Sequence, residues 1–280
     1  MLPLTHWPIE ARRNIIGVFT DIDDTLTTHG AITPDALQAL ADLKAAGLHV
    51  IPITGRPVGW AEPLASSWPV DAIVVENGAV ALKMAESAVF AENTPQIGIQ
   101  PAYLLPMVLS KLYQQDATIR ADNLARMARI AQQVLAQVPA AVLSRDHAGR
   151  ETDLAFDYKE FEDLPPETVQ DILAVLKHSG MQTTVSSIHI HGCFGHFDKW
   201  QGACWIVREL FQRDLAQELD RWVFVGDSGN DQAMFQHFTH SVGVANIRHF
   251  EAQLQHLPRY ITQGERGAGF AEVARSLLTV

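Results

Sequence analysis

Short apolar runs that end at clusters of polar residues recur at both ends of the chain. The clusters read VFTDIDDT, ITGRP, VENGA, FVGDSGND and GVAN, and each includes or directly follows the end of such a run. Strands that are apolar throughout, with helices between them, are typical of a parallel sheet covered on both faces. Ligands bind such sheets beyond the carboxyl ends of the strands. The pattern therefore predicts an α/β fold with one shared polar site at that edge.

The spacing of apolar residues between the runs predicts the helices. We expect strands at 15–19, 48–53, 70–75, 222–225 and 242–244, and helices at 58–66, 200–210, 229–238 and 269–278. A further helix opens at Thr33-Pro34 and is closed by Gly47, with Leu37, Leu40 and Leu43 predicted to face inward. Strand and helix thus alternate regularly in these two parts of the chain.

The middle of the chain, from about Leu82 to Ile190, lacks this alternation. Long helices are predicted at 121–138, with Leu124 and Met127 among the inward residues, and at 166–177. Strands are predicted at 152–156 and 183–190. We interpret residues 85–191 as an inserted α+β module, and 1–84 together with 192–280 as the core domain.

Composition excludes several classes of protein. The net charge is −11, with 32 acidic against 21 basic residues in 280, which argues against a general nucleic-acid binder. Two cysteines, Cys193 and Cys204, are too few for a disulfide framework. No apolar stretch is long enough to span a membrane, and the first residues do not resemble a signal peptide. We therefore expect a cytoplasmic protein, a monomer or a homodimer, with no nucleic-acid or membrane partner.

Three aspartates occupy four positions at the end of the first run: Asp21, Asp23 and Asp24. Carboxylates this close repel one another unless a cation or a reaction uses them. If the runs are parallel strands of one sheet, Asp227 and Asp231 share their site. Oxygen ligands of this kind suit Mg²⁺, and an aspartate can act as a nucleophile toward phosphorus.

The segments DIDDT, ITGR, FDK and GDSGND, in this order, resemble the four motifs of the haloacid dehalogenase superfamily. Each motif is short, but four in order at their expected places make a specific signal. The resemblance implies a Rossmann-like parallel-sheet core with helices on both faces. The insertion resembles, in placement and length, the C2-type cap of subfamily IIB, which includes sugar-phosphate phosphatases and phosphomannomutases.

The resemblance also implies catalytic roles. Asp21 is implied as the nucleophile, and Asp23 as the acid that protonates the leaving oxygen and then activates water. Thr54 is implied to hydrogen-bond the transferring phosphoryl group, and Lys199 to pair with Asp21 and the phosphoryl oxygens. An acid at position 23 favours phosphate-ester chemistry, because superfamily dehalogenases and P-type ATPases lack it there.

The resemblance further implies a Mg²⁺ site and substrate contacts. The metal ligands would be Asp21, Asp23 through its backbone carbonyl, Asp227, and Asp231 directly or through water. The candidate substrate-binding residues are Gly55, Asn77, Asn230 and Asn246. Asn77 and Asn246 are predicted with equal weight as turn residues or as substrate contacts.

These residues together predict a Mg²⁺-dependent phosphatase that acts on a small phosphomonoester, a sugar or polyol phosphate, through an aspartyl-phosphate intermediate. Two alternatives stay open. A phosphomutase would keep the same motifs but return the phosphate to its substrate, and a non-catalytic regulatory protein could use the same scaffold.

Several other residues admit two interpretations. The stretch IHIHGCFGH could place His189, His191, Cys193 and His196 as a soft-metal site, although a position at the cap edge or hinge is favoured. A solvated helix face is favoured over a grip on an anionic substrate for the arginines of the predicted cap. These are Arg120, Arg126, Arg129, Arg145 and Arg150. Arg56 is favoured as a loop anchor, and Asp24 as a solvated or backbone-capping residue.

Overall fold

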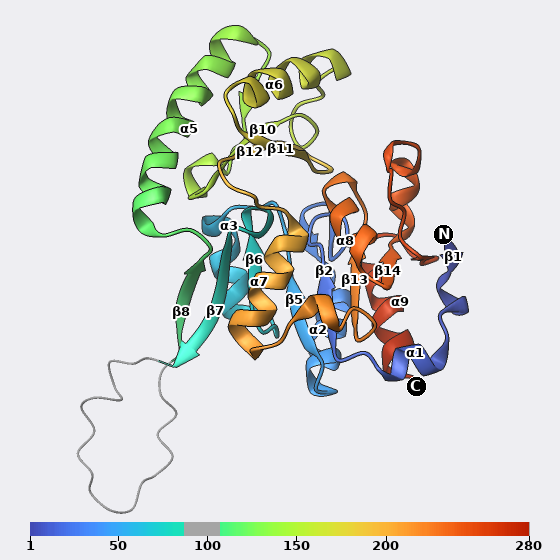
Figure 1. Cartoon of the computed structure of the whole chain (residues 1–280). Coiled ribbons are helices and arrows are strands. Elements are labelled where there is room, and N and C mark those ends of the chain that lie inside the picture. The colour runs from blue at the N-terminus through green and yellow to red at the C-terminus, as the bar shows by residue number, and fades with distance from the viewer. Residues whose placement is uncertain (87–106, 280) are drawn as a thin grey trace, which may run out of the picture.

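The computed structural model describes residues 1–86 and 107–279 (Figure 1). Its largest sheet has six parallel strands in the order β1-β15-β14-β13-β2-β5. They are β1 (Leu2–Pro3), β15 (Tyr260–Ile261), β14 (His240–Gly243), β13 (Trp222–Gly226), β2 (Gly17–Thr20) and β5 (His49–Pro52). The predicted α/β fold with a parallel sheet is confirmed, with β1 and β15 as additional short strands at one edge.

Helices cover both faces of this sheet because its strands carry apolar side chains on both sides. Val18 and Val225 pack with residues of α2, α3 and α9, whereas Phe19 and Phe224 pack with residues of α7 and α8. The bounds are α2 (Pro34–Ala45), α3 (Val58–Ser67), α7 (Lys199–Phe211), α8 (Gln232–His237) and α9 (Arg266–Leu278). All five lie where helices were predicted.

The end of α2 shows how local sequence sets the chain direction. Gly47 has φ +84°, a left-handed conformation that glycine adopts without strain. The Leu48 N–H then donates to the Leu43 carbonyl at 3.1 Å, so the chain turns directly from α2 toward β5. The prediction that Gly47 closes this helix is confirmed.

A three-stranded antiparallel sheet continues from the edge of the large sheet. It contains β6 (Ile73–Val75), β7 (Val80–Glu86) and β8 (Met107–Tyr113). A single parallel bridge between Ile53 and Val74 joins it to the end of β5. The strand predicted at 70–75 is therefore present but short.

A second module consists of a four-stranded antiparallel sheet with two long helices packed on it (Figure 1). The strands, in spatial order, are β11 (Gln182–Val185), β12 (His189–Cys193), β10 (Asp153–Asp157) and β9 (Val142–Leu143), and the helices are α5 (Ala117–Gln137) and α6 (Pro166–His178). Met127, Phe156, Ile172 and Ile190 belong to the apolar cluster between them. This module has its own core, as expected for an inserted α+β unit.

Short elements connect these layers. They are η1 (Leu4–His6), α1 (Ile9–Arg13), β3 (Thr27–Thr28), β4 (Ala31–Ile32), η2 (Glu76–Gly78), η3 (His147–Gly149), η4 (Leu215–Gln217), η5 (Gly229–Asp231), η6 (Ala245–His249) and η7 (Glu251–Gln253). The helix predicted at 229–238 is thus a 3₁₀ turn followed by α8.

Two residues predicted to face inward are exposed instead. Leu37 is 38% exposed and Leu124 is 50% exposed. Helix α2 packs through Ala36 and Leu40, so its buried stripe lies one position away from Leu37. Helix α5 packs from Asn123 and Met127 onward, which leaves Leu124 on the solvent side. The helical period was correct, but a period alone does not fix which neighbouring position faces the core.

The single strand predicted at 183–190 is wrong, because β11 and β12 are two antiparallel strands joined by a tight turn. The Ser186 hydroxyl accepts hydrogen bonds from the backbone N–H groups of Ile188 and His189, at 3.3 and 3.0 Å. A serine whose hydroxyl hydrogen-bonds to backbone N–H groups two or three residues ahead favours a turn over a continuous strand.

The division of the chain into core and cap stays a proposal. The proposed boundary at 84/85 falls inside β7, and β8 pairs with β7 rather than with the four-stranded sheet. Residues 87–106 of the proposed cap lie outside the described part of the chain.

Candidate active site

Asp21 and Asp227 stand side by side because the strands before them are parallel neighbours. Asp21 follows β2 and Asp227 follows β13, and both side chains are buried. The Asp21 N–H donates to the Val225 carbonyl at 2.8 Å. Residues more than 200 positions apart thus meet at the carboxyl edge of the sheet, where the sequence pattern placed the polar site.

Lys199, the first residue of α7, neutralises this acidic group. Its Nζ lies 2.5 Å from Asp21 Oδ1 and 2.7 Å from Asp231 Oδ1, and the side chain is fully buried. Although burial disfavours its charge, the two carboxylates raise the pKa of Lys199, so the ammonium form persists. A cation held in this place can also attract phosphoryl oxygens.

Asp231 holds the loop after β13 in shape. Its Oδ2 accepts hydrogen bonds from the N–H groups of Asp227 and Ser228, at 2.9 and 3.0 Å, while Oδ1 accepts from Lys199. Both carboxylate oxygens are therefore engaged by the protein. This geometry suits a residue that orients Asp227 and Lys199 more than a direct metal ligand.

The group formed by Asp21, Asp227 and Asp231 fits a divalent cation. One carboxylate oxygen from each lies within 4.8 Å of the others. Burial, followed by repulsion from Asp21 and Asp231, raises the pKa of Asp227 well above its usual value. Buried carboxylates that repel each other in this way gain from a shared cation. Because Asp231 is already engaged, Asp21 and Asp227 are the better direct ligands.

Asn246 and Thr25 contact the carboxylate of Asp227. The Asn246 side-chain amide donates to Asp227 Oδ2 and to the Asp24 carbonyl, each at 3.0 Å, and its oxygen accepts from the Arg266 N–H at 2.9 Å. The Thr25 hydroxyl lies 3.5 Å from Asp227 Oδ1. Asn246, predicted as a substrate contact or a turn residue, is thus placed to orient Asp227. Asp24 pairs with Arg266 at 2.9 Å, and no metal-ligand role is indicated for it.

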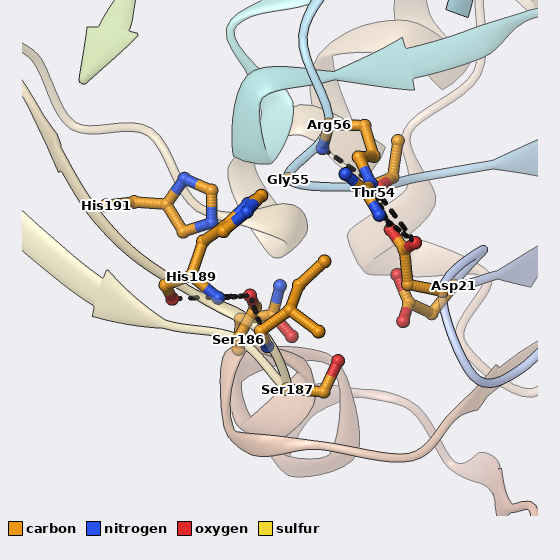
Figure 2. A pocket seen from close by; sticks show the side chains of 11 residues that line it. Asp21, Thr54, Gly55, Arg56, Ser186, Ser187, His189 and His191 are labelled. Atoms are coloured by element: carbon orange, nitrogen blue, oxygen red, sulfur yellow. Dashed lines mark hydrogen bonds and ion pairs between the residues drawn. The ribbon is translucent and has the colours of Figure 1, made fainter. Parts of the chain in front are cut away.

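A pocket opens in front of Asp21, between the carboxyl edge of the sheet and the α+β module (Figure 2). From the core it is lined by Asp21, Asp23, Thr54, Gly55, Arg56 and Asn230. From the module it is lined by the turn 186–188 and by His189 and His191. A group bound to Asp21 would therefore have the module on its far side.

Thr54, Gly55 and Asn230 line this pocket, and Asn77 lies beside it. The Thr54 hydroxyl accepts from the Arg56 N–H at 3.0 Å, and Asn230 Nδ2 lies 3.4 Å from Asn77 Oδ1. Asn77 has φ +53° and lines a neighbouring pocket rather than this one. The structure thus brings the predicted residues to one place, and their roles in catalysis stay proposals.

Arg56 links Asp23 to the α+β module. Its Nη2 lies 2.9 Å from Asp23 Oδ1 and 2.7 Å from Glu160 Oε1, and its Nη1 lies 3.4 Å from Asp146 Oδ2. Although burial opposes the change, contacts with His189 and Arg56 lower the pKa of Glu160 to about 2. Arg56 therefore does more than anchor its own loop. It links the carboxylate of Asp23, the candidate acid, to two carboxylates of the α+β module.

Replacing Arg56 by lysine is expected to lower the free energy of unfolding by about 1–2 kcal/mol, because an ammonium cannot reproduce the bidentate fork. Urea denaturation measures the change. The same substitution at Arg13, whose side chain is 54% exposed beside Glu10, serves as the control and should cost less than about 0.5 kcal/mol. Equal effects at the two positions would contradict this role for Arg56.

The histidine-rich stretch does not assemble as the soft-metal alternative requires. His189 Nε2 lies 2.8 Å from Glu160, His191 Nδ1 lies 3.0 Å from Asp153, and His196 contacts Gln182. Within residues 1–86 and 107–279, no group of possible metal ligands contains two of these histidines. His189 and His191 instead face the pocket from β12, which agrees with the favoured position at the cap edge (Figure 2).

The arginines of the α+β module do not line the pocket. Arg120, Arg126 and Arg145 lie over the rings of Tyr113, Phe194 and Phe161, at 3.6, 3.6 and 3.7 Å from the ring centroids. Arg150 is buried against Asp146 and Asp153, and Arg129 is exposed. Among the described residues that line the pocket, Arg56 is the only arginine or lysine.

Sequence reasoning missed Glu76, which connects the core to the module. This buried carboxylate accepts hydrogen bonds from the N–H groups of Val58, Glu151 and Thr152, and burial raises its pKa to about 7. It sits in the polar cluster VENGA, where only Asn77 was considered. The turn residues 186–188 were missed as well, and no motif marks them.

The fold and the site define an α/β enzyme with a cluster of buried carboxylates at the carboxyl edge of a parallel sheet, beside a buried lysine. The chain belongs to the haloacid dehalogenase-like hydrolase family, whose model matches residues 18–189. A second family model, for sucrose-6F-phosphate phosphohydrolase, matches residues 206–274. The predicted superfamily is confirmed.

A curated relative extends over nearly the whole chain. The Streptococcus pyogenes serotype M6 protein named Putative phosphatase M6_Spy0533 is 20% identical over 92% of this chain and 96% of its own length. Together with the family match, this relative confirms the prediction of a haloacid dehalogenase-type phosphatase.

Solved structures share the fold across both modules. Thermoplasma acidophilum 0175 has a TM-score of 0.65 at 15% identity and covers 95% of this chain and 99% of its own. The sucrose-phosphatase of Synechocystis sp. PCC6803, solved with sucrose and phosphate, has a TM-score of 0.62 at 16% identity and covers 95% and 98%. The sugar phosphatase BT4131, described as subclass IIB, has a TM-score of 0.56 at 15% identity and covers 94% and 97%.

Among the described residues, no helix has both the length and the apolar composition needed to span a membrane.

Proposed function

We propose that this protein is a Mg²⁺-dependent phosphatase that hydrolyses a small sugar or polyol phosphate through an aspartyl-phosphate at Asp21. The observation that supports it best is the placement of Asp21, which contacts Lys199 at 2.5 Å, groups with Asp227 and lines the pocket. An attacking carboxylate needs a neighbouring cation, and a donor for the phosphoryl oxygens. Lys199 and a bound Mg²⁺ are the candidate cations, and Lys199 and Thr54 are the candidate donors.

In the proposed reaction an Asp21 oxygen attacks phosphorus, and the bond to the leaving oxygen breaks. Lys199, against Asp21, and Thr54, on the pocket wall, would hold the phosphoryl oxygens. Bound Mg²⁺ would supply positive charge that offsets repulsion between Asp21 and the phosphate. Water then hydrolyses the aspartyl-phosphate and restores the carboxylate.

Asp23 is the proposed acid and base in this reaction. It lines the same pocket, and Arg56 holds its carboxylate from one side. It would protonate the leaving oxygen in the first step and accept a proton from water in the second. The α+β module would act as the cap, with the leaving group between it and the core.

The class of substrate is proposed from the relatives and from the pocket. A family model for sucrose-6F-phosphate phosphohydrolase and the fold shared with a sucrose-phosphatase favour a sugar phosphate. The polar lining from Ser186, Ser187 and the two histidines of β12 suits a leaving group with hydroxyls. The proposed partners are therefore small phosphorylated metabolites, and the proposed location is the cytoplasm, where Cys193 and Cys204 would stay free thiols.

A screen of phosphorylated metabolites with MgCl₂, measuring release of inorganic phosphate, tests the proposal. Release from at least one sugar or polyol phosphate, lost on addition of EDTA, is expected. Formation of an isomer without free phosphate would support a phosphomutase instead, although the arginines of the α+β module that would anchor a second phosphate do not line the pocket. No turnover of any phosphate ester would leave only the non-catalytic alternative.

Magnesium binding is expected to strengthen as pH rises from about 6 to about 8. Burial raises the pKa of Asp21 to about 7, against the opposing effect of Lys199. In the metal-free folded protein Asp21 thus keeps its proton to a higher pH than it does in the unfolded chain. The contribution of Asp21 to the free energy of unfolding is therefore present at low pH and is lost as pH rises through about 7. Metal binding needs the carboxylate, so affinity should fall about tenfold per pH unit below that pKa.

Isothermal titration with MgCl₂ at several pH values measures this dependence. The variant Asp21→Asn serves as the control, because it has no carboxylate to titrate at this position and should lose that part of the slope. Equal affinity of the unmodified protein at about pH 6 and about pH 8 would contradict the assignment of Asp21 as a ligand.

A further inference from the structure

His191 has one ring nitrogen bound and one free. The residue lies on β12, is 3% exposed, and its Nδ1 lies 3.0 Å from Asp153 Oδ2. No group among the described residues hydrogen-bonds its Nε2, although that atom is buried. His189 Nε2 also lacks a hydrogen bond of regular geometry, but it lies 2.8 Å from a Glu160 carboxylate oxygen, and no such ion-pair contact is found for His191 Nε2 among the described residues.

The surroundings of His191 decide which nitrogen carries the proton. Arg150 holds Asp153 through two contacts of 2.8 and 3.1 Å, so the Asp153 carboxylate acts as an acceptor. The hydrogen bond to Asp153 therefore needs a proton on His191 Nδ1. Burial, followed by the charge of Arg150, lowers the pKa of His191 well below its usual value, so the ring is neutral. Nε2 then carries a lone pair and can only accept a hydrogen bond.

The free nitrogen lies at the pocket that Asp21 lines. His191 and Thr54 belong to the lining of the same pocket and lie on opposite sides of it in Figure 2. A Cβ at Gly55 would stand 3.0 Å from His191 Nε2, so glycine at this position lets the ring approach the Thr54 loop closely. With the phosphoryl group at Asp21, the module side of the pocket receives the leaving group.

We infer that His191 Nε2 accepts a hydrogen bond from a hydroxyl of the leaving group and thereby selects polyol and sugar phosphates over phosphate esters without hydroxyls. Asp153 is the positioning residue, because it fixes the tautomer that leaves Nε2 as an acceptor. This inference rests on the proposed phosphatase function and assigns part of its specificity to one side chain.

Two six-carbon substrates test it: sorbitol 6-phosphate, with hydroxyls, and hexyl phosphate, without them. For His191→Phe, which has no acceptor, the ratio of kcat/KM for sorbitol 6-phosphate to kcat/KM for hexyl phosphate should fall about tenfold. His191→Gln, which returns a polar group near the Nε2 position, should recover part of the loss. His196→Phe makes the same change at an exposed histidine outside the pocket lining and should alter neither value.

A second measurement does not depend on turnover. Nitrogen-15 NMR of the labelled full chain should show His191 as a neutral ring protonated on Nδ1, and a proton on Nε2 would overturn the inference even if His191→Phe does not fold. Unchanged preference for sorbitol 6-phosphate in folded His191→Phe, or no preference in the unmodified protein, would also overturn it. Absence of phosphate release from both esters and from the whole metabolite screen would instead count against the phosphatase function itself.

Discussion

Replacing Asp21 by asparagine is expected to lower the rate of phosphate release by at least about 10⁴-fold, because an amide oxygen cannot form the covalent intermediate. The fold should tolerate the change, since asparagine has the same shape and removes one of several buried, mutually repelling carboxylates. A continuous phosphate assay measures the rate, with the same substrate for both proteins.

Asp24→Asn provides the matched control. Asp24 lies three residues away, has φ +54°, a conformation that asparagine also adopts, and pairs with Arg266 on the surface side of the site. Its activity should stay within about threefold of the unmodified protein, because one partly exposed ion pair contributes little. Similar losses in both variants would mean that the charge of the loop, rather than Asp21 as nucleophile, supports the activity.

Replacing Lys199 by methionine is expected to have the largest effect on stability, about 3–5 kcal/mol in the absence of metal. The substitution keeps most of the packing volume but leaves Asp21 and Asp231 buried without their cation. The rate of phosphate release should also fall by about 10²–10³-fold, because a donor to the phosphoryl oxygens is lost. Urea denaturation with and without MgCl₂ measures the stability, and added Mg²⁺ should restore part of it.

Lys44→Met is the control for this substitution. Lys44 pairs with Asp71 at 2.7 Å, but its side chain is 30% exposed, so water screens the pair. Its loss should cost no more than about 1 kcal/mol. If Lys199→Met were as mild as Lys44→Met, the buried lysine would not be what holds the acidic group together.

The core could be predicted from the sequence because its local signals agree. Apolar runs of strand length, with helical patterns between them and Gly47 at a helix end, predicted the order of strands and helices, and β2, β5 and β13 lie where expected. The polar residues after β2, β5 and β13 lie at one edge, as parallel pairing requires. Here the sequence pattern and the fold follow from the same physical rule.

The α+β module was less predictable because its signals are weaker. The tight turn at Ser186 depends on hydrogen bonds of one hydroxyl, and apolar residues on both sides of it read as one strand. Helices α2 and α5 were found, but Leu37 and Leu124 were placed inward, because helical spacing does not fix which position meets a neighbour. Packing partners decide that choice.

What the sequence determined by itself was the position of the acidic edge: short apolar strands followed closely by Asp21, Thr54 and Asp227, with Lys199 in a motif between Thr54 and Asp227. Local patterns suffice there because a strand's end fixes where the next residue lies. Only the tertiary structure decided the contacts around the pocket. Arg56 of the core reaches Glu160 of the α+β module, and this contact depends on how two independently packed cores meet. His191 has one nitrogen held by Asp153 and the other free, and this contact depends on how strands β12 and β10 pair. No local pattern encodes either arrangement.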